Sequence, residues 1–340
     1  MTAATPSPGS SAVQAALGEF GRIERYLRPL AADFPGAFDL TDDAALVDVP
    51  AGQQLVVTTD AMVAGVHFLA SDPPEHIALK LLAVNLSDLA AKGASPLGYS
   101  LVTALPKGTG EDWLARFAAG LADGQRRWGI HLLGGDSVST QGPVALTLSA
   151  LGLVPQGSMV RRAGARPGDR VVVSGSIGDA ALGLRLVLGQ LDAPHERSVY
   201  EMLVDRLRRP EPRLALAPAL RMSASAAVDV SDGLVADLAH LARASGVRVI
   251  IEAARVPVSD AAATLLAQVP DLMATMLTGG DDYELAFTVA PARMEALRQA
   301  AAAAGVEVTE VGRVEAGSGV QVQDRDGTVL DLAAGGWQHF

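Results

Sequence analysis

The sequence predicts an α/β or α+β fold divided into two domains, and three observations support this prediction. The chain has 340 residues, which is long enough for two domains that each bury a core. Hydrophobic residues make up 49% and charged residues 19%, proportions that are typical of a compact folded protein. Segments with strand character alternate with helical segments in both halves, which indicates mixed layers of helix and sheet.

The first half begins with residues 1–16, a stretch that is rich in Ser, Pro and Ala. It has neither the basic start nor the apolar segment of a signal peptide, so we expect a disordered leader. A helix is expected to begin near Leu17, because Phe20, Ile23 and Tyr26 follow at helical spacing. The further elements expected in this half are strands over 44–49 and 55–59, a buried helix over 77–91, a strand over 97–105, a helix over 111–128, and strands over 130–133 and 143–154.

A polar stretch rich in Gly, Arg and Pro, residues 156–169, interrupts this pattern, and we place the domain boundary there. The expected domains are therefore 17–155 and 156–340. The elements expected in the second half are a strand over 170–173, a helix over 179–188, a strand over 226–230, a helix over 234–244 that Gly246 caps, and a strand over 284–289.

Composition excludes several classes of function. The formal net charge is −11 and the sequence has no basic stripe, so a nucleic-acid partner is not expected. The chain has no cysteine, which removes disulfides, thiolate nucleophiles and cysteine-based zinc sites. No apolar run approaches the ~18 residues of a membrane span. We therefore expect a cytoplasmic protein that is not bound to a membrane.

Aspartates recur at the expected ends of strands. Asp60 follows two threonines, Asp136 follows two glycines, and Asp229 and Asp232 flank a strand end beside Ser and Gly. Asp42 precedes the expected strand over 44–49. Each one alone could be a turn former or a helix cap. Together they predict a ligand site, because loops at strand ends converge.

Asp88 stands out because it lies in an almost wholly apolar segment, 81–91. Burying an unpaired carboxylate costs several kcal/mol, so a metal ion or a buried base should lie near it. Only Lys80 and Lys92 are close in sequence, at the two ends of the segment. The alternative is that Asp88 caps a helix that restarts after a break at Asn85.

Carboxylates with hydroxyl groups suit Mg²⁺, which binds through a few carboxylates together with substrate phosphates and waters. Several such ions let two phosphate groups approach one another and spread the charge of a transferring phosphoryl group. The chain has no P-loop and no protein-kinase motifs. The Gly-rich segment 174–178 could hold an anion at a helix N-terminus, or it could be only a turn.

The motifs together resemble the thiamine-monophosphate kinase family, within the superfamily that includes aminoimidazole ribonucleotide synthetase. The resemblance runs from Gly18 to Phe340, nearly the whole chain. Its motifs are, in order, Thr59-Asp60-x-x-Val63-Ala64-Gly65-Val66-His67-Phe68, the segment 83–94 around Asn85-Leu86-Ser87-Asp88, Gly134-Gly135-Asp136, Asp229-Val230-Ser231-Asp232-Gly233-Leu234, and Gly279-Gly280-Asp281-Asp282-Tyr283-Glu284-Leu285.

The resemblance implies ATP-dependent phosphorylation of thiamine monophosphate to the diphosphate, by direct transfer assisted by several Mg²⁺ ions. It implies an N-terminal α/β domain that binds ATP and Mg²⁺ and dimerises through its sheet, with a C-terminal α/β domain beside it. The implied metal ligands are Asp42, Thr58, Thr59, Asp60, Asp88, Asp136, Asp229 and Asp232. The implied ATP contacts are Asp42, Thr58, Gly135, Asp136, Arg162 and Ser231. The implied substrate contacts are His67, Asp281 and Trp337, and the residues assigned to the catalytic step are Asp60, Asp88, Asp136 and Asp232.

Read from the residues alone, three of these positions have simpler interpretations. Arg162 could hold a phosphate or be a solvated linker charge. Trp337 could stack on the cationic thiazolium ring or anchor the C-terminus by packing. His67 could be an ordinary core or loop histidine.

The chain departs from the family pattern at two positions. It has Thr41 where the family usually has Gly, so the turn before Asp42 can differ. It has Asp281 where the family usually has Glu. The shorter side chain could act through a water, or Asp282 could replace it.

Two rival functions follow from the same motifs. One is another ATP-dependent enzyme of the superfamily, of the aminoimidazole ribonucleotide synthetase type. The hydrogenase-maturation and selenophosphate members need a reactive Cys or selenocysteine, and this sequence has neither. The other rival is a non-catalytic protein that binds nucleotide or thiamine phosphate, and the full set of aspartates argues against it.

Overall fold

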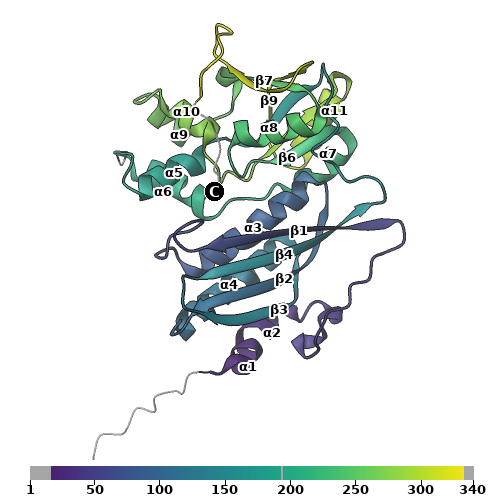
Figure 1. Cartoon of the computed structure of the whole chain (residues 1–340), viewed down its shortest axis with the longest axis vertical. Helices are drawn as coiled ribbons and strands as arrows, with labels where there is room; N and C mark the ends of the chain where they lie inside the picture. Colours follow the sequence, from purple (N-terminus) through teal and green to yellow (C-terminus); the bar gives the residue numbers. More distant parts are fainter. Residues whose placement is uncertain (1–16, 193, 333–340) are drawn as a thin grey trace, which may run out of the picture.

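The computed structural model describes residues 17–192 and 194–332, which form two mixed sheets with helices packed against them (Figure 1). The predicted α/β class is confirmed. The expected leader, 1–16, and Trp337 lie outside the described residues. No helix within the described ranges is long and apolar enough to cross a membrane.

The first half forms a four-stranded sheet in the order β1-β4-β2-β3. β4 runs antiparallel to β1 and β2, and β3 runs parallel to β2. The elements of this half are α1 (Glu19–Arg22), η1 (Ile23–Leu27), α2 (Arg28–Ala31), η2 (Pro35–Leu40), β1 (Gln53–Val63), α3 (Pro74–Ala91), β2 (Ser95–Pro106), α4 (Glu111–Trp128), β3 (His131–Thr140) and β4 (Ala145–Pro155).

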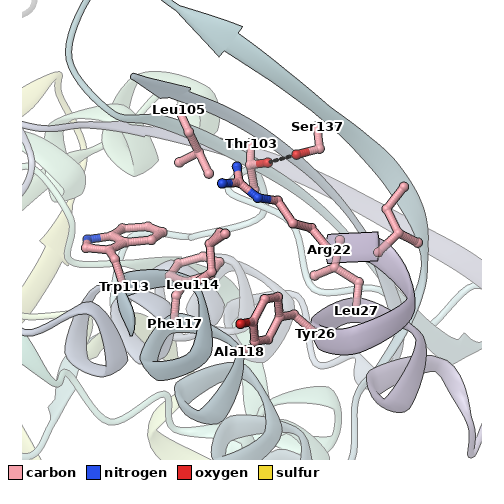
Figure 2. A pocket seen from close by; sticks show the side chains of 11 residues that line it. Arg22, Tyr26, Leu27, Thr103, Leu105, Trp113, Leu114, Phe117, Ala118 and Ser137 are labelled. Atoms are coloured by element: carbon pink, nitrogen blue, oxygen red, sulfur yellow. Dashed lines mark hydrogen bonds between the residues drawn. The ribbon is translucent and has the colours of Figure 1, made fainter. Parts of the chain in front are cut away.

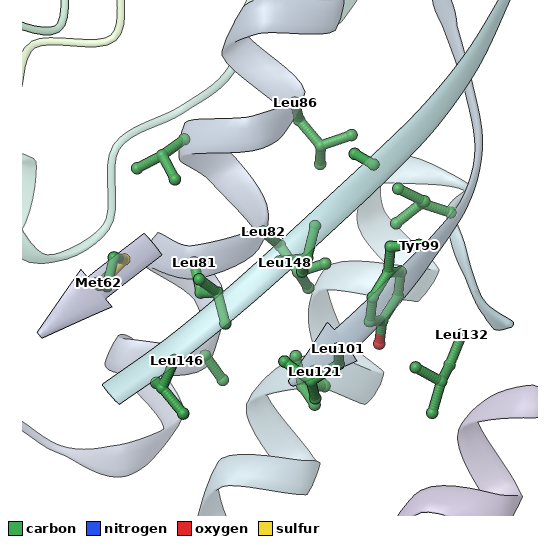
Figure 3. Close-up of a cluster of buried hydrophobic side chains, with 14 of the residues drawn as sticks. Met62, Leu81, Leu82, Leu86, Tyr99, Leu101, Leu121, Leu132, Leu146 and Leu148 are labelled. Atoms are coloured by element: carbon green, nitrogen blue, oxygen red, sulfur yellow. The ribbon is translucent and has the colours of Figure 1, made fainter. Parts of the chain in front are cut away.

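The core of the first half lies between this sheet and the helices α3 and α4 (Figure 3). Leu82 and Leu86 of α3 pack with Leu148 of β4 and Tyr99 of β2, all fully buried. Burying each such side chain contributes about 1.5–3 kcal/mol, which fixes α3 firmly against the sheet. The last turn of α3, with Ala90 and Ala91, belongs instead to a core of the second half. α3 therefore joins the two halves, as its almost wholly apolar sequence requires.

The second half forms a six-stranded sheet in the order β10-β7-β9-β5-β8-β6, which is antiparallel except for the pair β7 and β10. α8 packs with one core cluster of this half, and α7 and α11 with another. The elements are β5 (Arg170–Ser174), α5 (Asp179–Val187), α6 (Arg197–Arg208), η3 (Leu214–Leu216), α7 (Ala217–Ser223), β6 (Ala224–Asp229), α8 (Leu234–Ser245), β7 (Arg248–Glu252), η4 (Ala253–Arg255), α9 (Asp260–Leu266), α10 (Leu272–Thr278), β8 (Leu285–Val289), η5 (Pro291–Arg293), α11 (Met294–Ala303), β9 (Val308–Glu315) and β10 (Gly319–Gln323).

Three strand predictions of the first half need correction. Residues 44–49 form no strand, because this segment pairs with no strand of the described residues and the Leu46 N–H donates instead to the Gly36 carbonyl of η2 at 2.8 Å. The expected strand over 55–59 is part of the longer β1, and the one over 130–133 is part of the longer β3. Both strands continue because β4 and β2 pair with them along their whole length.

Candidate active site

Helix α3 holds Asp88 against strand β1. The Thr58 hydroxyl donates a short hydrogen bond to the Asp88 carboxylate. One turn earlier, the Asn85 side-chain oxygen accepts from the Asp60 N–H at 3.2 Å, and its amide donates to the Leu81 carbonyl at 3.0 Å. α3 runs unbroken through Asn85, so the alternative that Asp88 caps a restarted helix is wrong.

Asp60 and Asp88 act on each other electrostatically. Burial, and then the negative charges of Asp88 and Asp232, raise the pKa of Asp60 to about 6. Asp60 and Asp88 come from the first half of the chain, whereas Asp232 follows β6 in the second half. The structure therefore brings these predicted residues together across the two halves.

Asp229, the last residue of β6, belongs to the same group. Burial raises its pKa well above the ordinary value, and the charges of Asp88 and Asp237 raise it further. A hydrogen bond from Ser87 and the charge of Lys92 act in the opposite direction. We call Asp60, Asp88, Asp229 and Asp232 the acidic cluster.

The turn that carries Ser231 and Asp232 is held by Asp237 of α8. The Asp237 carboxylate accepts the N–H of Ser231 at 3.0 Å and of Asp232 at 2.9 Å. Burial raises the pKa of Asp237 to about 7, although these backbone bonds favour its ionised form. Arg162 lies close enough for its charge to favour ionised Asp237, and its carbonyl accepts from the Ser245 hydroxyl at 3.1 Å. Arg162 therefore lies near Asp237, the residue that holds the turn carrying Asp232.

Three other predicted residues lie apart from the cluster. In the sheet, the neighbour of Asp60 on the adjacent strand is buried Leu148, so Asp60 lies on the face that α3 covers. The neighbour of Asp136 is exposed Val102, so Asp136 lies on the opposite face. Thr59 also lies on that opposite face, with its hydroxyl 2.8 Å from Ser149. Asp42 is exposed in the segment before β1.

The expectation that both aspartate motifs of the first half end their strands is wrong. β1 continues past Asp60 to Val63, and β3 continues past Asp136 to Thr140. Gly135 sits inside β3, where an added Cβ would lie 1.8 Å from the Leu101 carbonyl oxygen, so this position has no room for a side chain. The two aspartates are thus presented by sheet faces rather than by loops.

His67 and Asp281 are brought together by a lysine. The Lys80 ammonium donates to the His67 carbonyl at 3.0 Å and lies 3.2 Å from the Asp281 carboxylate. The His67 ring nitrogen Nδ1 accepts the N–H of Val63 at 3.0 Å, which places the proton of the neutral ring on Nε2.

Asp282 points away from this group. It is buried, and its carboxylate accepts the N–H of Gly178 at 2.7 Å and of Ala180 at 3.3 Å. It therefore closes the Gly-rich segment 174–178 with a carboxylate of the chain itself. This contact disfavours both alternatives raised by the sequence, an external anion at this turn and Asp282 as a replacement for Asp281.

A separate pocket lies between η1, α4 and the strands β2 and β3 (Figure 2). Trp113 and Phe117 line it on one side, and Thr103 and Ser137, whose hydroxyls are 3.0 Å apart, on another. Its lining includes no residue of the acidic cluster. It does not belong to the candidate active site.

The donor set of the acidic cluster fits Mg²⁺ in company with a substrate. Within the described ranges, no three His, Asp or Glu side chains are close enough to form a ready-made metal site. Beyond the effect of burial, the negative charge of Asp88 raises the pKa of both Asp60 and Asp229, and that of Asp232 also raises the pKa of Asp60, a repulsion that a divalent cation would relieve. Because Mg²⁺ is usually held by one or two carboxylates plus phosphates and waters, a looser set of this kind suits it.

Comparison with known proteins decides the family. The model described as AIR synthase related protein, N-terminal domain, matches residues 41–154, and its C-terminal counterpart matches residues 166–325. A thiamine-monophosphate kinase from Caulobacter vibrioides is 47% identical over 327 residues, covering 94% of this chain and 90% of that relative. The chain belongs to the thiamine-monophosphate kinase family.

Solved structures of thiamine-monophosphate kinases share the fold. The enzyme from Stenotrophomonas maltophilia superposes with a TM-score of 0.78 at 43% identity, covering 86% of this chain and 91% of that one. A structure described as AaThiL complexed with AMPPCP and TMP has a TM-score of 0.76 at 32% identity, covering 95% and 97% of the two chains.

Sequence reasoning did not find the roles of three residues of this thiamine-monophosphate kinase family site: it named Lys80 only as a possible base near Asp88, and it gave Asp237 and Tyr283 no role. Lys80, Asp237 and Tyr283 all hold predicted residues in place. Lys80 had a signal, because a lysine near one end of an apolar helix needs a partner. Asp237 had a weaker one, an acid in the first turn of a helix that follows a Gly turn. Tyr283 stands in the last of the family motifs, but nothing in the sequence alone gave it a role.

Proposed function

We propose that the protein transfers the γ-phosphoryl group of ATP to the phosphate of thiamine monophosphate, giving thiamine diphosphate and ADP. The observation that carries this proposal is the acidic cluster, assembled from both halves of the chain, whose mutual repulsion calls for divalent cations. The names of the relatives and the ligands of the AaThiL structure, AMPPCP and TMP, support the choice of substrates.

The chemistry asks little of the protein beyond positioning. An oxygen of the acceptor phosphate forms a bond to the γ-phosphorus, and the bond from that phosphorus to the β–γ bridging oxygen breaks. A phosphate acceptor is already anionic near neutral pH, so no residue has to remove a proton from it. The chain's contribution is to hold two anions in line at short range.

The residues that would hold Mg²⁺ are Asp60, Asp88, Asp229 and Asp232 with the Thr58 hydroxyl, together with Thr59 and Asp136 from the other sheet face and Asp42 from the segment before β1. When bound, the ions would neutralise the phosphates and polarise the transferring group. Arg162, Gly135 and Ser231 would contact ATP, and His67, Asp281 and Trp337 the thiamine phosphate.

We also propose that the protein is a homodimer formed through the uncovered sheet face. That face exposes apolar side chains from three strands, among them Val57 at 61%, Val138 at 46% and Val102 at 38% of their surface. Single exposed apolar residues are common, but a row across a sheet is typical of an interface. Asp136 and Thr59 lie on the same face, so a partner subunit would cover them.

The proposal includes two further expectations, one about the domain boundary and one about the location of the protein in the cell. The chain would divide near residues 155 and 156 into a first domain that carries the dimer face and a second that carries Asp229 and Asp232. The protein would act in the cytoplasm, where ATP is available.

The reaction itself is the test. Purified protein with ATP, Mg²⁺ and thiamine monophosphate should release ADP and thiamine diphosphate in equal amounts, measured by chromatography. ADP release with aminoimidazole ribonucleotide precursors, or binding of ATP without turnover, would instead select one of the rival functions.

The dimer has its own test. Light scattering should give twice the chain mass, and Val57→Glu should yield monomers because it buries a charge in the interface. A wild-type protein that stays monomeric at micromolar concentration would contradict the dimer.

A further inference from the structure

Lys80 is an unusual lysine for its position. It lies in α3, among apolar side chains, and only 3% of its surface is exposed. The chain has only three lysines, Lys80, Lys92 and Lys107, and the third is exposed. Burying an ammonium group without a partner is strongly unfavourable, so the contacts of Lys80 indicate what it is for.

Those contacts join the two halves of the chain. The Lys80 ammonium donates to the His67 carbonyl at 3.0 Å, just after β1, and pairs with the Asp281 carboxylate at 3.2 Å, just before β8. The Asp281 side chain is 28% exposed, so the ion pair lies at the edge of the core with its acidic side toward the solvent.

Asp281 is also tied to the turn that carries Asp232 of the acidic cluster. The Tyr283 hydroxyl donates to the Asp281 carboxylate oxygen that does not face Lys80, at 3.2 Å. The Asp281 N–H donates to the Ser231 carbonyl at 2.8 Å. The backbone φ angle of Asp281 is 70°, a value that residues other than Gly seldom adopt. A backbone held in this way persists only where its surroundings fix it, and Lys80 supplies one of the fixing contacts.

The turn that carries His67 is fixed by the same ammonium group. The Gly65 N–H donates to the Phe68 carbonyl at 2.8 Å, and the His67 N–H to the Val63 carbonyl at 3.0 Å. The His67 carbonyl points to Lys80, which anchors this turn to α3.

We propose that Lys80 is a positioning residue of the acceptor site: it holds the Asp281 carboxylate beside the His67 turn and balances its charge. This inference rests on the proposed function, in which Asp281 and His67 contact thiamine monophosphate. Lys80 acts through these two residues and does not itself touch the reacting phosphates.

The test compares Lys80→Met, Lys80→Gln and wild type in steady-state kinetics. Lys80→Met should raise the KM for thiamine monophosphate about 10- to 100-fold, the range for losing hydrogen bonds to a charged group. The KM for ATP should stay within about twofold, because the acidic cluster is untouched. Lys80→Gln keeps N–H donors without the charge, so its effect should be smaller. Lys107→Met, the same change at an exposed site, should leave both constants unchanged.

A double-mutant cycle with Asp281→Asn tests whether Lys80 works through Asp281. In the Asp281→Asn background, adding Lys80→Gln should change the KM for thiamine monophosphate by less than about twofold, because coupled residues are not additive. Should Lys80→Met fail to fold, which a thermal melt reveals, this cycle still decides the matter.

Equal effects of Lys80→Gln in both backgrounds, or an unchanged acceptor KM in the folded Lys80→Met variant, would overturn the inference while wild-type turnover left the proposed function intact. Wild-type protein that does not phosphorylate thiamine monophosphate would overturn the proposed function itself.

Discussion

The two regions that carry the predicted site residues differ in how firmly they are held. In the second half, the segments 229–233 and 279–284 are bonded to each other and to α3, α5 and α8. In the first half, the side chains of Asp42, Thr59 and Asp136 are exposed, and the Thr59 hydroxyl lies 2.8 Å from that of Ser149 on the neighbouring strand. The fold alone therefore holds the residues of the second half in place, and we call this the firm side of the site. The exposed residues of the first half, the open side, would be held only once substrate, metal or a partner subunit binds.

Glu284 tests the firm side most strongly. It is fully buried, and its carboxylate accepts from the guanidinium groups of Arg206 and Arg213 and from the Ser174 hydroxyl at 2.6 Å. Glu284→Gln leaves two cations without their shared counter-charge, so unfolding free energy should fall by about 3–5 kcal/mol in urea titrations. Glu75→Gln breaks the exposed pair with Arg116 and should cost at most about 1 kcal/mol. Equal losses in the two variants would show that burial does not strengthen the pair.

Asp88, which α3 of the first half contributes, tests the chemistry of the acidic cluster, to which the second half contributes Asp229 and Asp232. Asp88→Asn keeps the shape of the side chain and removes its charge, so kcat should fall about 10²- to 10³-fold, as when one electrostatic stabiliser of a transition state is lost. Its melting temperature should not fall, because Asp60 and Asp229 lose a repelling neighbour. Asp112→Asn, at an exposed position of α4, is the control. Near-normal turnover in Asp88→Asn would remove Asp88 from the site.

Gly280 tests how closely the two segments of the second half approach. A Cβ at Gly280 would lie 2.2 Å from the Ser231 carbonyl oxygen, so Gly280→Ala must push the turn that carries Asp232. We expect a loss of about 1–3 kcal/mol in stability, the usual cost of overpacking, together with lower turnover. Gly142→Ala, whose nearest new contact would be an ordinary 3.5 Å, should change neither. Wild-type stability in Gly280→Ala would mean that the two segments move apart freely.

Asp136 tests the open side and should have the smallest effect on stability. Because Asp136 is exposed, Asp136→Asn should change the unfolding free energy by no more than about 0.5 kcal/mol. Its turnover should nevertheless fall, because the carboxylate would act once ATP, metal and a partner subunit are in place. Unchanged activity, measured over a range of Mg²⁺ concentrations, would place Asp136 outside the site.

Sequence-based prediction of the site was most informative where a charged residue stood in an apolar segment. Asp88 stood out in an apolar helix, and its charge acts on Asp60 and Asp229, while the metal ion predicted near it stays a prediction. Long periodic helices were equally clear, since the expected helix over 111–128 has the bounds of α4.

The predictions that failed depended on pairing between distant segments. The end of β1 is set by β4 and that of β3 by β2, so the position of Asp60 and Asp136 within their strands could not be read locally. The face on which Asp136 lies depends on a register shift between β2 and β3 near Tyr99. The partner of Lys80 follows from tertiary packing alone.

The central claim is that the acidic cluster holds divalent cations that let two anionic substrates meet. Its most direct test counts bound Mn²⁺, a paramagnetic substitute for Mg²⁺, by electron paramagnetic resonance in the presence of AMPPCP. The wild-type protein should bind Mn²⁺ in this complex, and Asp88→Asn should lose at least one ion per chain. The same number of ions bound with the same affinity in both proteins would contradict the account.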